Sequence, residues 1–278
     1  MPLARVAVLT ALAMVAFAGN SLLCRLALAA GHIDAASFTS VRLASGAVTL
    51  AALVLARKPA RRLEGSWPSA LALFAYAIAF SFAYTGLSAA TGALLLFGAV
   101  QGTMVGVGFA RGERLTTVQA VGMLVAVGGL VGLLLPGLTA PPLVDALLML
   151  GAGVAWGVYS LRGRRAQDAT AETAGNFVRS VPLALAVSAI TLSHAAVDLT
   201  GVGLAVASGA LTSGLGYAIW YTALPALNAT TAATVQLSVP ALAAAGGVVL
   251  LGEPFGVRLA LASAMILGGV AVVILAKR

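Results

Sequence analysis

Long apolar stretches follow one another along the chain, and the short segments between them hold most of the polar residues. A helix needs about 20 apolar residues to cross a hydrocarbon core about 30 Å thick. The pattern predicts ten membrane-spanning helices, at residues 4–30, 36–56, 67–88, 91–110, 115–135, 143–163, 173–193, 199–222, 228–250 and 255–276. Several breaks are very short, such as Ser88–Thr91 and Gly252–Pro254, and short breaks are typical of antiparallel helical hairpins.

The start of the chain has two interpretations. Arg5, the apolar run after it and the small-residue triplet Ala16-Phe17-Ala18 resemble a cleavable secretory signal. The apolar run continues to about Ala30, however, and a matching segment recurs in the second half of the chain. We therefore expect this segment to be the first span.

The sequence repeats itself at an offset near 140 residues. The clearest matches pair Gly112-Glu113 with Gly252-Glu253, and Gly128-Gly129 with Gly268-Gly269. The repeat predicts two five-span halves, residues 1–138 and 139–278, and the odd number of spans places the second half upside down in the membrane. We therefore expect an all-α membrane protein of ten transmembrane helices, arranged as two inverted five-helix repeats, a design that favours alternating access.

Composition excludes a soluble protein, because 61% of the residues are hydrophobic and only 9% are charged. The net charge of +8 would suggest a nucleic-acid partner in a soluble domain, but here the basic residues lie in short loops, so we expect none. The single cysteine, Cys24, lies inside an apolar segment, which excludes an intramolecular disulfide and a thiolate metal site. No cofactor or metal is expected.

The basic residues predict the orientation, since cytoplasmic loops carry an excess of Lys and Arg. With a cytoplasmic N-terminus, the cytoplasmic side holds twelve of the 16 basic residues: Arg5, Arg57, Lys58, Arg61, Arg62, Arg111, Arg114, Arg162, Arg164, Arg165, Lys277 and Arg278. We expect a bacterial-type inner membrane with both termini cytoplasmic. Arg25 and Arg258 lie near outer ends, and Arg42 and Arg179 fall inside the second and seventh spans.

The ninth span and the turn after it carry a family resemblance. They read Ser238-Val239-Pro240, a small-residue run over 243–247, and Leu251-Gly252-Glu253-Pro254. Together with the ten spans and the duplication, these motifs resemble the drug/metabolite transporter superfamily, EamA type, over nearly the whole chain. The first half departs from the pattern, because Ala99-Val100-Gln101 stands where the proline is expected, although nearby glycines could supply a bend.

Within that superfamily the chain is most similar to bacterial aromatic amino acid exporters. This resemblance implies a central cavity lined by the first, third, fourth, sixth, eighth and ninth spans. It also implies that the hairpins of spans 3–4 and 8–9 close the cavity alternately.

Aromatic side chains mark the expected binding site. They recur at helical spacing as Tyr76, Phe80 and Tyr84 on the third span, Trp156 and Tyr159 with Ser160 on the sixth, and Tyr217, Trp220 and Tyr221 on the eighth. Two such walls would bind a flat substrate by stacking and by attraction to its amino group. The alternative for Tyr84, Tyr159, Trp220 and Tyr221 is the aromatic belt of the membrane interface, where we expect Trp67 to be an anchor.

Uncharged polar side chains form a second set. Asn20, Gln101 and Gln236 are the best candidates to orient a zwitterionic substrate, because amides offer donors and acceptors without net charge. The rest could instead join helices: Ser21, Thr103, Asn228, Thr231, Thr234 and Ser238.

Glycine and proline mark expected motion. Gly98-x-x-x-Gly102-x-x-x-Gly106 permits close helix approach, and Pro240 removes a hydrogen bond in mid-span, so Gly98, Gly102 and Pro240 are the candidate hinges. Pro182 is either a further hinge or a static kink. Glu113 and Glu253 are expected to stabilise helix N-termini.

Several kinds of chemistry have no support. All eight acidic residues fall in loops or near span ends, and both histidines lie in loops, so no proton relay is expected to cross the membrane. The sequence contains no Gly-x-x-x-x-Gly-Lys loop and no His-Glu-x-x-His motif, so we expect no enzyme.

We expect an inner-membrane carrier that exports small molecules, with aromatic and other neutral amino acids as cargo. The alternatives are a carrier of amines, sugars, purine derivatives or xenobiotics, or a channel. The expected partners are the lipid bilayer and the small-molecule substrate. The oligomeric state stays open, and a monomer is compatible with the sequence.

Overall fold

The computed structural model describes residues 1–57, 62–110, 112, 116–137, 140–163, 166–227 and 229–276. In these ranges the chain is helical, apart from turns, loops and one isolated bridge between Ile33 and Val197, which confirms the predicted all-α class. Ten residues named above lie outside the described ranges: Lys58, Arg61, Arg111, Glu113, Arg114, Arg164, Arg165, Asn228, Lys277 and Arg278.

The helices follow the predicted spans closely. The first half contains α1 (Leu3–Ala29), α2 (Ala35–Leu55), α3 (Trp67–Ala83), α4 (Ala89–Ala110) and α5 (Thr117–Leu134). The second half contains α6 (Leu143–Gly163), α7 (Ala169–Ile190), η1 (Leu192–His194), α8 (Leu199–Val206), η2 (Ala207–Leu215), α9 (Gly216–Ala223), η3 (Leu224–Ala226), α10 (Ala229–Gln236), α11 (Ser238–Leu251) and α12 (Val257–Leu275). The predicted eighth span comprises α8, η2 and α9, and the ninth comprises α10 and α11.

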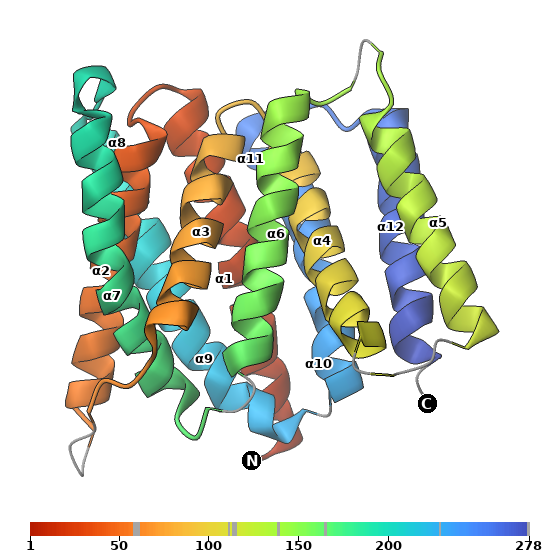
Figure 1. Cartoon of the computed structure of the whole chain (residues 1–278), viewed down its shortest axis with the longest axis horizontal. Helices are drawn as coiled ribbons and strands as arrows, with labels where there is room; N and C mark the ends of the chain where they lie inside the picture. The colour runs from red at the N-terminus through yellow and green to blue at the C-terminus, as the bar shows by residue number, and fades with distance from the viewer. Residues whose placement is uncertain are drawn as a thin grey trace.

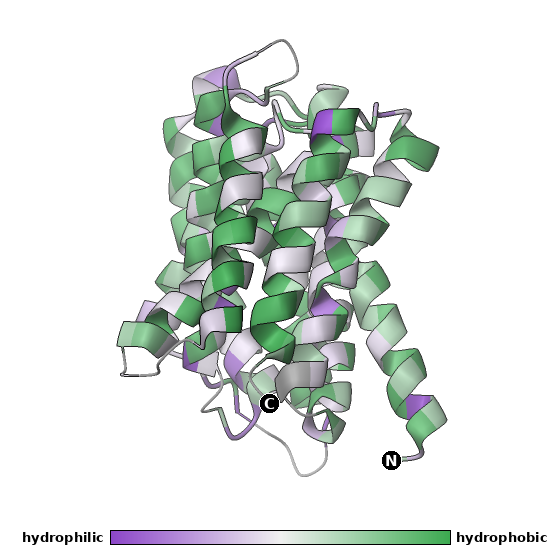
Figure 2. Cartoon of the chain, turned by 90° about the vertical axis from the view of Figure 1, so that its right-hand side faces the viewer, coloured by the Kyte–Doolittle hydropathy of each residue, from purple (hydrophilic) through white to green (hydrophobic). Residues whose placement is uncertain are grey.

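Length and composition make this a multi-pass membrane protein. Within the described residues, nine helical segments are long and apolar enough to cross a membrane, and α3 is a shorter apolar helix. Large hydrophobic side chains such as Val48, Leu124 and Leu250 are at least 70% exposed. Figure 2 shows mostly hydrophobic residues along the outer faces of the helices, with hydrophilic residues concentrated near their ends. Such a surface is stable in lipid and not in water.

Polar residues at the ends of the apolar runs fix where helices begin. Asp34 accepts hydrogen bonds from the N–H groups of Ala36 and Ser37 at the start of α2. Asp168 caps α7, which is why this helix begins four residues before the predicted start at 173. These caps satisfy N–H groups that have no partner inside the helix.

Backbone hydrogen bonds join two loops at the upper end of Figure 1. The Asp34 N–H donates to the Ala196 carbonyl and the Asp198 N–H donates to the His32 carbonyl, both at 2.8 Å. The Asp198 carboxylate caps α8 through the Gly201 N–H and also contacts His32 Nδ1 at 2.7 Å. We call these four loop residues, His32, Asp34, Ala196 and Asp198, the loop clasp.

The main helix contacts form matching pairs when the first five spans are exchanged with the last five. In Figure 1, α5 and α12 lie together at one side, α2 with α7 and α8 at the other, and α1, α3, α4, α6 and α9 between them. Helix α6 packs on α3 and α4, and its counterpart α1 packs on the eighth and ninth spans. The pairs α2–α7 and α5–α12 each join one helix with its own counterpart.

Glycines bring α5 and α12 into backbone contact. A Cβ atom on Gly122 would lie 2.7 Å from the Gly269 carbonyl oxygen, and one on Gly129 would lie 3.2 Å from the Ala262 carbonyl oxygen. At the offset of 140, Gly122 corresponds to Ala262 and Gly129 to Gly269, so each contact is the counterpart of the other. Small residues at these positions allow close helix packing in a membrane.

The glycine repeat of α4 does not act as predicted. A Cβ atom on Gly102 or Gly106 would have nothing within 4 Å, so the expected close approach at these two positions is wrong. The glycines that bring α4 and α6 together are on α6: a Cβ on Gly153 would lie 2.6 Å from Ala99 Cβ, and one on Gly157 would lie 2.8 Å from Thr103 Cβ. Only Gly98 of the predicted motif has a tight neighbour, Ile266 at 3.3 Å.

Two spans of the second half are irregular. Residues 207–215 form a π-helical segment in the eighth span, which the sequence did not predict. The ninth span breaks at Leu237, between α10 and α11. Pro240 has no N–H to donate to the Gln236 carbonyl, so the helix interrupts just before the proline. Pro182, in contrast, lies inside α7 without interrupting it.

Candidate functional site

A central cavity of about 800 Å³ lies between the two halves of the chain. Its lining comes mainly from α1, α3, α4 and α6, from η2 and α9 of the eighth span, and from α10 of the ninth span, which are the six spans that the family resemblance implied. The start of α7 also contributes, through Ala169 and Thr170. The cavity is large enough to hold a drug-sized molecule.

Trp156 lies at the centre of the aromatic lining. Its ring stacks against Tyr159 on α6 and Tyr217 on α9, with centroids 5.3 Å apart in each pair, and it contacts Tyr76 on α3 at 4.8 Å. Phe17 of α1, for which no role was predicted, has its ring centroid 5.5 Å from that of Tyr217. Rings from four elements therefore form one continuous aromatic surface facing the cavity.

Hydrogen bonds hold the polar part of this surface. Asn20 donates through Nδ2 to the Tyr76 hydroxyl at 3.2 Å, and its Oδ1 accepts from the Ser208 hydroxyl at 2.6 Å. Tyr159 donates to Thr173 Oγ1 at 3.2 Å, and Thr173 donates to the Tyr221 hydroxyl at 3.3 Å. The positions of Asn20, Tyr76 and Tyr159 are thus fixed before any ligand enters.

The structure brings most of the predicted residues to the cavity. The lining includes Asn20, Tyr76, Phe80, Gln101, Trp156, Tyr159, Ser160, Tyr217, Trp220, Tyr221 and Gln236. Of the other polar candidates, Ser21 also lines the cavity, whereas the Thr103 and Ser238 hydroxyls donate to carbonyls of their own helical turns. Trp67 is 55% exposed at the start of α3, as an interface anchor would be.

Tyr84 is the exception among the predicted binding residues. It is fully buried, packs edge-on against Phe80 at 4.7 Å and donates to the Ala89 carbonyl at 3.4 Å, and it is not part of the cavity lining. Its position one turn beyond Phe80 places it above the cavity, inside the α3–α4 hairpin. The prediction that it faces the cavity is therefore wrong for this conformation.

Arg42 lies directly behind the cavity wall, and no role was predicted for it from the sequence. Its side chain is buried, with Nη2 donating to the Tyr76 hydroxyl at 2.9 Å and Nε to Ser213 Oγ at 3.5 Å. Its guanidinium carbon lies 4.9 Å from the centre of the Phe80 ring. A charged residue inside an apolar span was the signal that should have identified it.

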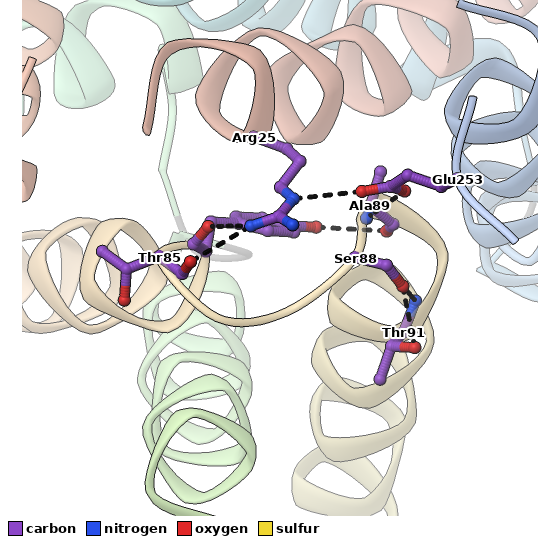
Figure 3. Close-up of polar contacts among 7 residues, drawn as sticks. Arg25, Thr85, Ser88, Ala89, Thr91 and Glu253 are labelled. Atoms are coloured by element: carbon purple, nitrogen blue, oxygen red, sulfur yellow. Dashed lines mark hydrogen bonds and ion pairs between the residues drawn. The ribbon is translucent and has the colours of Figure 1, made fainter. Parts of the chain in front are cut away.

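The upper end of the cavity is closed by a set of contacts drawn in Figure 3. Arg25 Nε pairs with Glu253 Oε1 at 3.0 Å, while Arg25 Nη1 donates to the Tyr84 and Thr85 carbonyls at 3.1 Å. Glu253 Oε2 accepts from the Ala89 N–H at 2.8 Å, which confirms its predicted role at a helix N-terminus, here that of α4. We call Arg25, Glu253 and the Tyr84–Ala89 turn the upper latch. It joins α1, the α3–α4 hairpin and the turn before α12.

At the lower end, where the chain begins, the lining continues into loops. It includes residues 166–168 before α7 and residues 224–227 after α9. Arg57 and Asp168 lie at this rim and form an ion pair at 2.9 Å. The cavity therefore reaches the lower surface while the upper latch separates it from the upper one.

Comparisons with known proteins place these features in a family. Residues 144–275 match the EamA-like transporter family. The chain is 56% identical over 277 residues to an uncharacterized protein, PA1977, of Pseudomonas aeruginosa, covering 99% of this chain and 96% of that protein.

More distant similarities agree with this match. The threonine/homoserine exporter RhtA of Salmonella typhimurium is 33% identical over 113 residues, which are 40% of this chain and 38% of that exporter. RhtA of Escherichia coli is 31% identical over the same length. A protein crystal structure superposes with a TM-score of 0.68 over 99% of both chains at 21% identity, which supports the fold alone.

Proposed function

Because this chain belongs to the EamA-like transporter family, we propose that it exports aromatic and other neutral amino acids across a bacterial inner membrane by alternating access. The observation that carries the proposal is the aromatic cavity of about 800 Å³, which reaches one end of the molecule and is latched at the other. A flat side chain can stack on the rings of Trp156 and Tyr217, and the amides of Asn20 and Gln101 offer hydrogen bonds to a zwitterion.

Direction of transport follows from the predicted orientation. The basic loops predict that the lower end, where the cavity opens, faces the cytoplasm with both termini. In that orientation the present conformation would accept cargo from the cytoplasm, as an exporter requires. Opening of the upper latch and closure at the lower rim would then release cargo outside.

Alternating access is supported by the two halves of the chain. We infer that residues 1–138 and 139–278 are inverted repeats, because the main helix contacts and the paired glycine contacts of α5 and α12 match when the halves are exchanged. In such folds the substrate binds near the membrane midplane, between the halves. The cavity, lined by residues of both halves, is the proposed place of binding.

A second cargo is supported by the comparison with RhtA, a threonine/homoserine exporter. Small hydroxylated amino acids have the same zwitterionic backbone as phenylalanine, so the same polar groups can bind them. Only the fit of the side chain to the aromatic surface would differ. Amines, sugars, purine derivatives and xenobiotics remain the alternative cargo.

The test is counterflow of labelled phenylalanine, tryptophan and threonine by purified protein in liposomes, with and without a pH gradient. We expect saturable counterflow that does not depend on the gradient, because no titratable relay was found in the spans. Protein-free liposomes are the control. A flux that never saturates would identify a channel, and folded protein that carries none of the three would shift the cargo to the alternatives.

A further inference from the structure

No carboxylate among the described residues forms an ion pair with the positive charge of Arg42. The described residues form three ion pairs, Arg25–Glu253, His32–Asp198 and Arg57–Asp168, and Arg42 belongs to none of them. Its side chain is only 1% exposed, and its Nη1 is a buried donor without a hydrogen-bond partner in the described part of the chain. A buried charge of this kind calls for a compensating group.

The charge lies close to the cavity but is separated from it by two aromatic side chains. Arg42 lies seven residues into α2, about 10 Å from the start of that helix at 1.5 Å per residue. Its guanidinium carbon is 5.3 Å from the ring centre of Tyr76 and 4.9 Å from that of Phe80, and both rings line the cavity. The field of Arg42 therefore reaches a ligand through one layer of side chains.

The Tyr76 hydroxyl connects Arg42 to the cavity. Its oxygen accepts from Arg42 Nη2 at 2.9 Å and from Asn20 Nδ2 at 3.2 Å. Both lone pairs are then used, while the hydroxyl proton donates to no group among the described residues. A phenol whose oxygen is hydrogen-bonded to a cation is a stronger donor, because successive hydrogen bonds polarise one another.

No anion of the cavity lining competes with a ligand for this donor. Among the described lining residues the charged side chains are Arg57 and Asp168, which pair with each other at the rim at 2.9 Å. At the Tyr76 and Phe80 rings, the nearby charge among the described residues is therefore the positive one of Arg42. A cationic amine would be repelled there, and a neutral sugar would leave the charge uncompensated.

We propose that the cavity recognises a carboxylate, with the Tyr76 hydroxyl as the direct donor and Arg42 as the positioning residue behind it. The substrate class that this names, carboxylate-bearing molecules with a flat side chain, rests on the proposed export function. It separates amino acids from the amines, sugars and uncharged xenobiotics that the family resemblance left open.

The test compares two probes of the same shape that differ in charge, phenylacetate and phenylacetamide. Isothermal titration of the purified full-length protein in detergent should give at least tenfold tighter binding of phenylacetate. Arg42→Gln and Tyr76→Phe should each reduce this preference to twofold or less, and Arg42→Lys, which keeps the charge, should retain part of it. If Arg42→Gln does not fold, Tyr76→Phe decides.

Matched controls exclude a general effect of either substitution. Arg179→Gln removes an arginine of α7 that, among the described residues, bonds to the Glu64 and Gly175 carbonyls, and Tyr84→Phe removes a phenol outside the cavity, so both should keep the wild-type preference. Equal binding of the two probes by the wild type, or an unchanged preference in folded Tyr76→Phe, would overturn the proposal.

Failure of the export function would look different. Absence of amino acid counterflow together with a preference for phenylacetate would overturn the export function and leave carboxylate recognition standing. Amino acid counterflow without a preference for phenylacetate would overturn carboxylate recognition and leave the export function standing.

Discussion

Trp156 contacts three other rings of the cavity's aromatic lining. It has Tyr159 on one side, Tyr217 on the other and Tyr76 at its edge. Because these partners come from α3, α6 and α9, the ring joins both halves of the chain. Its loss would remove a stacking surface for the substrate and also loosen the rings around it.

We therefore expect Trp156→Ala and Tyr217→Ala to reduce phenylalanine counterflow by about tenfold each, since a lost aromatic stacking partner costs about 1.5 kcal/mol. The measurement is counterflow in liposomes, with gel filtration to verify folding. Trp67→Ala, which removes an exposed indole at the start of α3, should transport normally. Normal transport by both cavity variants would assign these rings to packing alone.

Residue types and spacing predicted most of the cavity lining. An interval of four residues put Tyr76 and Phe80 on one helical face, and both line the cavity. The same interval included Tyr84, which the structure places inside a closed hairpin. Spacing identifies a face of a helix but does not show where along the helix a cavity ends. Arg42 was noted only as falling inside the second span, because a sequence does not show whether a charge in a span has a partner.

Irregular helices are concentrated in the second half of the chain, and Pro240 explains one of them. The ninth span breaks at Leu237, which leaves Gln236 at the end of α10 and on the cavity wall. The first-half counterpart of this span, α4, is continuous from Ala89 to Ala110. The hairpin of the eighth and ninth spans therefore contains a helix break that the α3–α4 hairpin lacks.

Pro240→Ala should restore the missing hydrogen bond and stiffen the ninth span, at a gain of up to about 3 kcal/mol in helix stability. We expect turnover in the counterflow assay to fall severalfold, while the affinity for phenylalanine changes by less than twofold. Pro182→Ala, in a helix that the proline does not interrupt, is the matched control. Unchanged turnover in Pro240→Ala would show that Pro240 does not act as a hinge in the proposed transport cycle.

The loop clasp has a pH dependence whose sign follows from Asp198. The hydrogen bond from the Gly201 N–H, together with that from His32, lowers the pKa of Asp198 below its ordinary value of 3.8. The folded clasp thus favours the carboxylate, so its stabilisation is complete above pH 3.8 and is lost as the pH falls through the lowered pKa.

Hydrogen exchange should report this change locally. Between pH 6 and pH 3, after correction for intrinsic exchange, we expect the protection of the Gly201 and Asp198 amides to decrease while that of α2 stays constant. Asp198→Asn should show the low protection at both pH values. Equal pH dependence in this variant and the wild type would mean that another group controls the clasp.

Helices were easier to predict than their irregularities. Each span is a long apolar run, and bilayer thickness alone sets its length, so nearly every helix end was found to within five residues. The π-helical segment at 207–215 was missed because its residues are compatible with an ordinary α-helix. Within it, Gly209 lies against the Arg42 carbonyl and Gly214 against Thr49, and no local sequence pattern encodes such tertiary contacts.

The two ends of the whole molecule differ in how they are held. At the upper end, Glu253 and Arg25 join α1, α4 and the turn before α12, with side chains that are 12% and 21% exposed. At the lower end, the cavity reaches the loops beside the Arg57–Asp168 pair. The described contacts therefore stabilise the conformation that is closed above.

Weakening the upper latch should shift the equilibrium toward a conformation that is open at the upper end. Loss of a partly buried ion pair costs roughly 1–2 kcal/mol after solvent screening, so Glu253→Gln should raise the population of the upward-open conformation about tenfold. Labelling of a cysteine at Ser21, which is 2% exposed and lines the cavity, from the upper side in a Cys24→Ala background would measure it. Arg258→Gln, which removes an arginine bonded to the Leu135 carbonyl at the same end, is the control. Equal labelling with and without Glu253→Gln would show that the latch does not hold the upper end closed.

Tyr84 and Tyr221 correspond to each other at the repeat offset of 137 residues, yet their surroundings differ. Tyr221 lines the open end of the cavity, whereas Tyr84 is fully enclosed at the closed end. Under alternating access, each half would take up the arrangement now held by the other. The enclosed surroundings of Tyr84 would then be the next environment of Tyr221, and the cavity-lining position of Tyr221 would be the next environment of Tyr84.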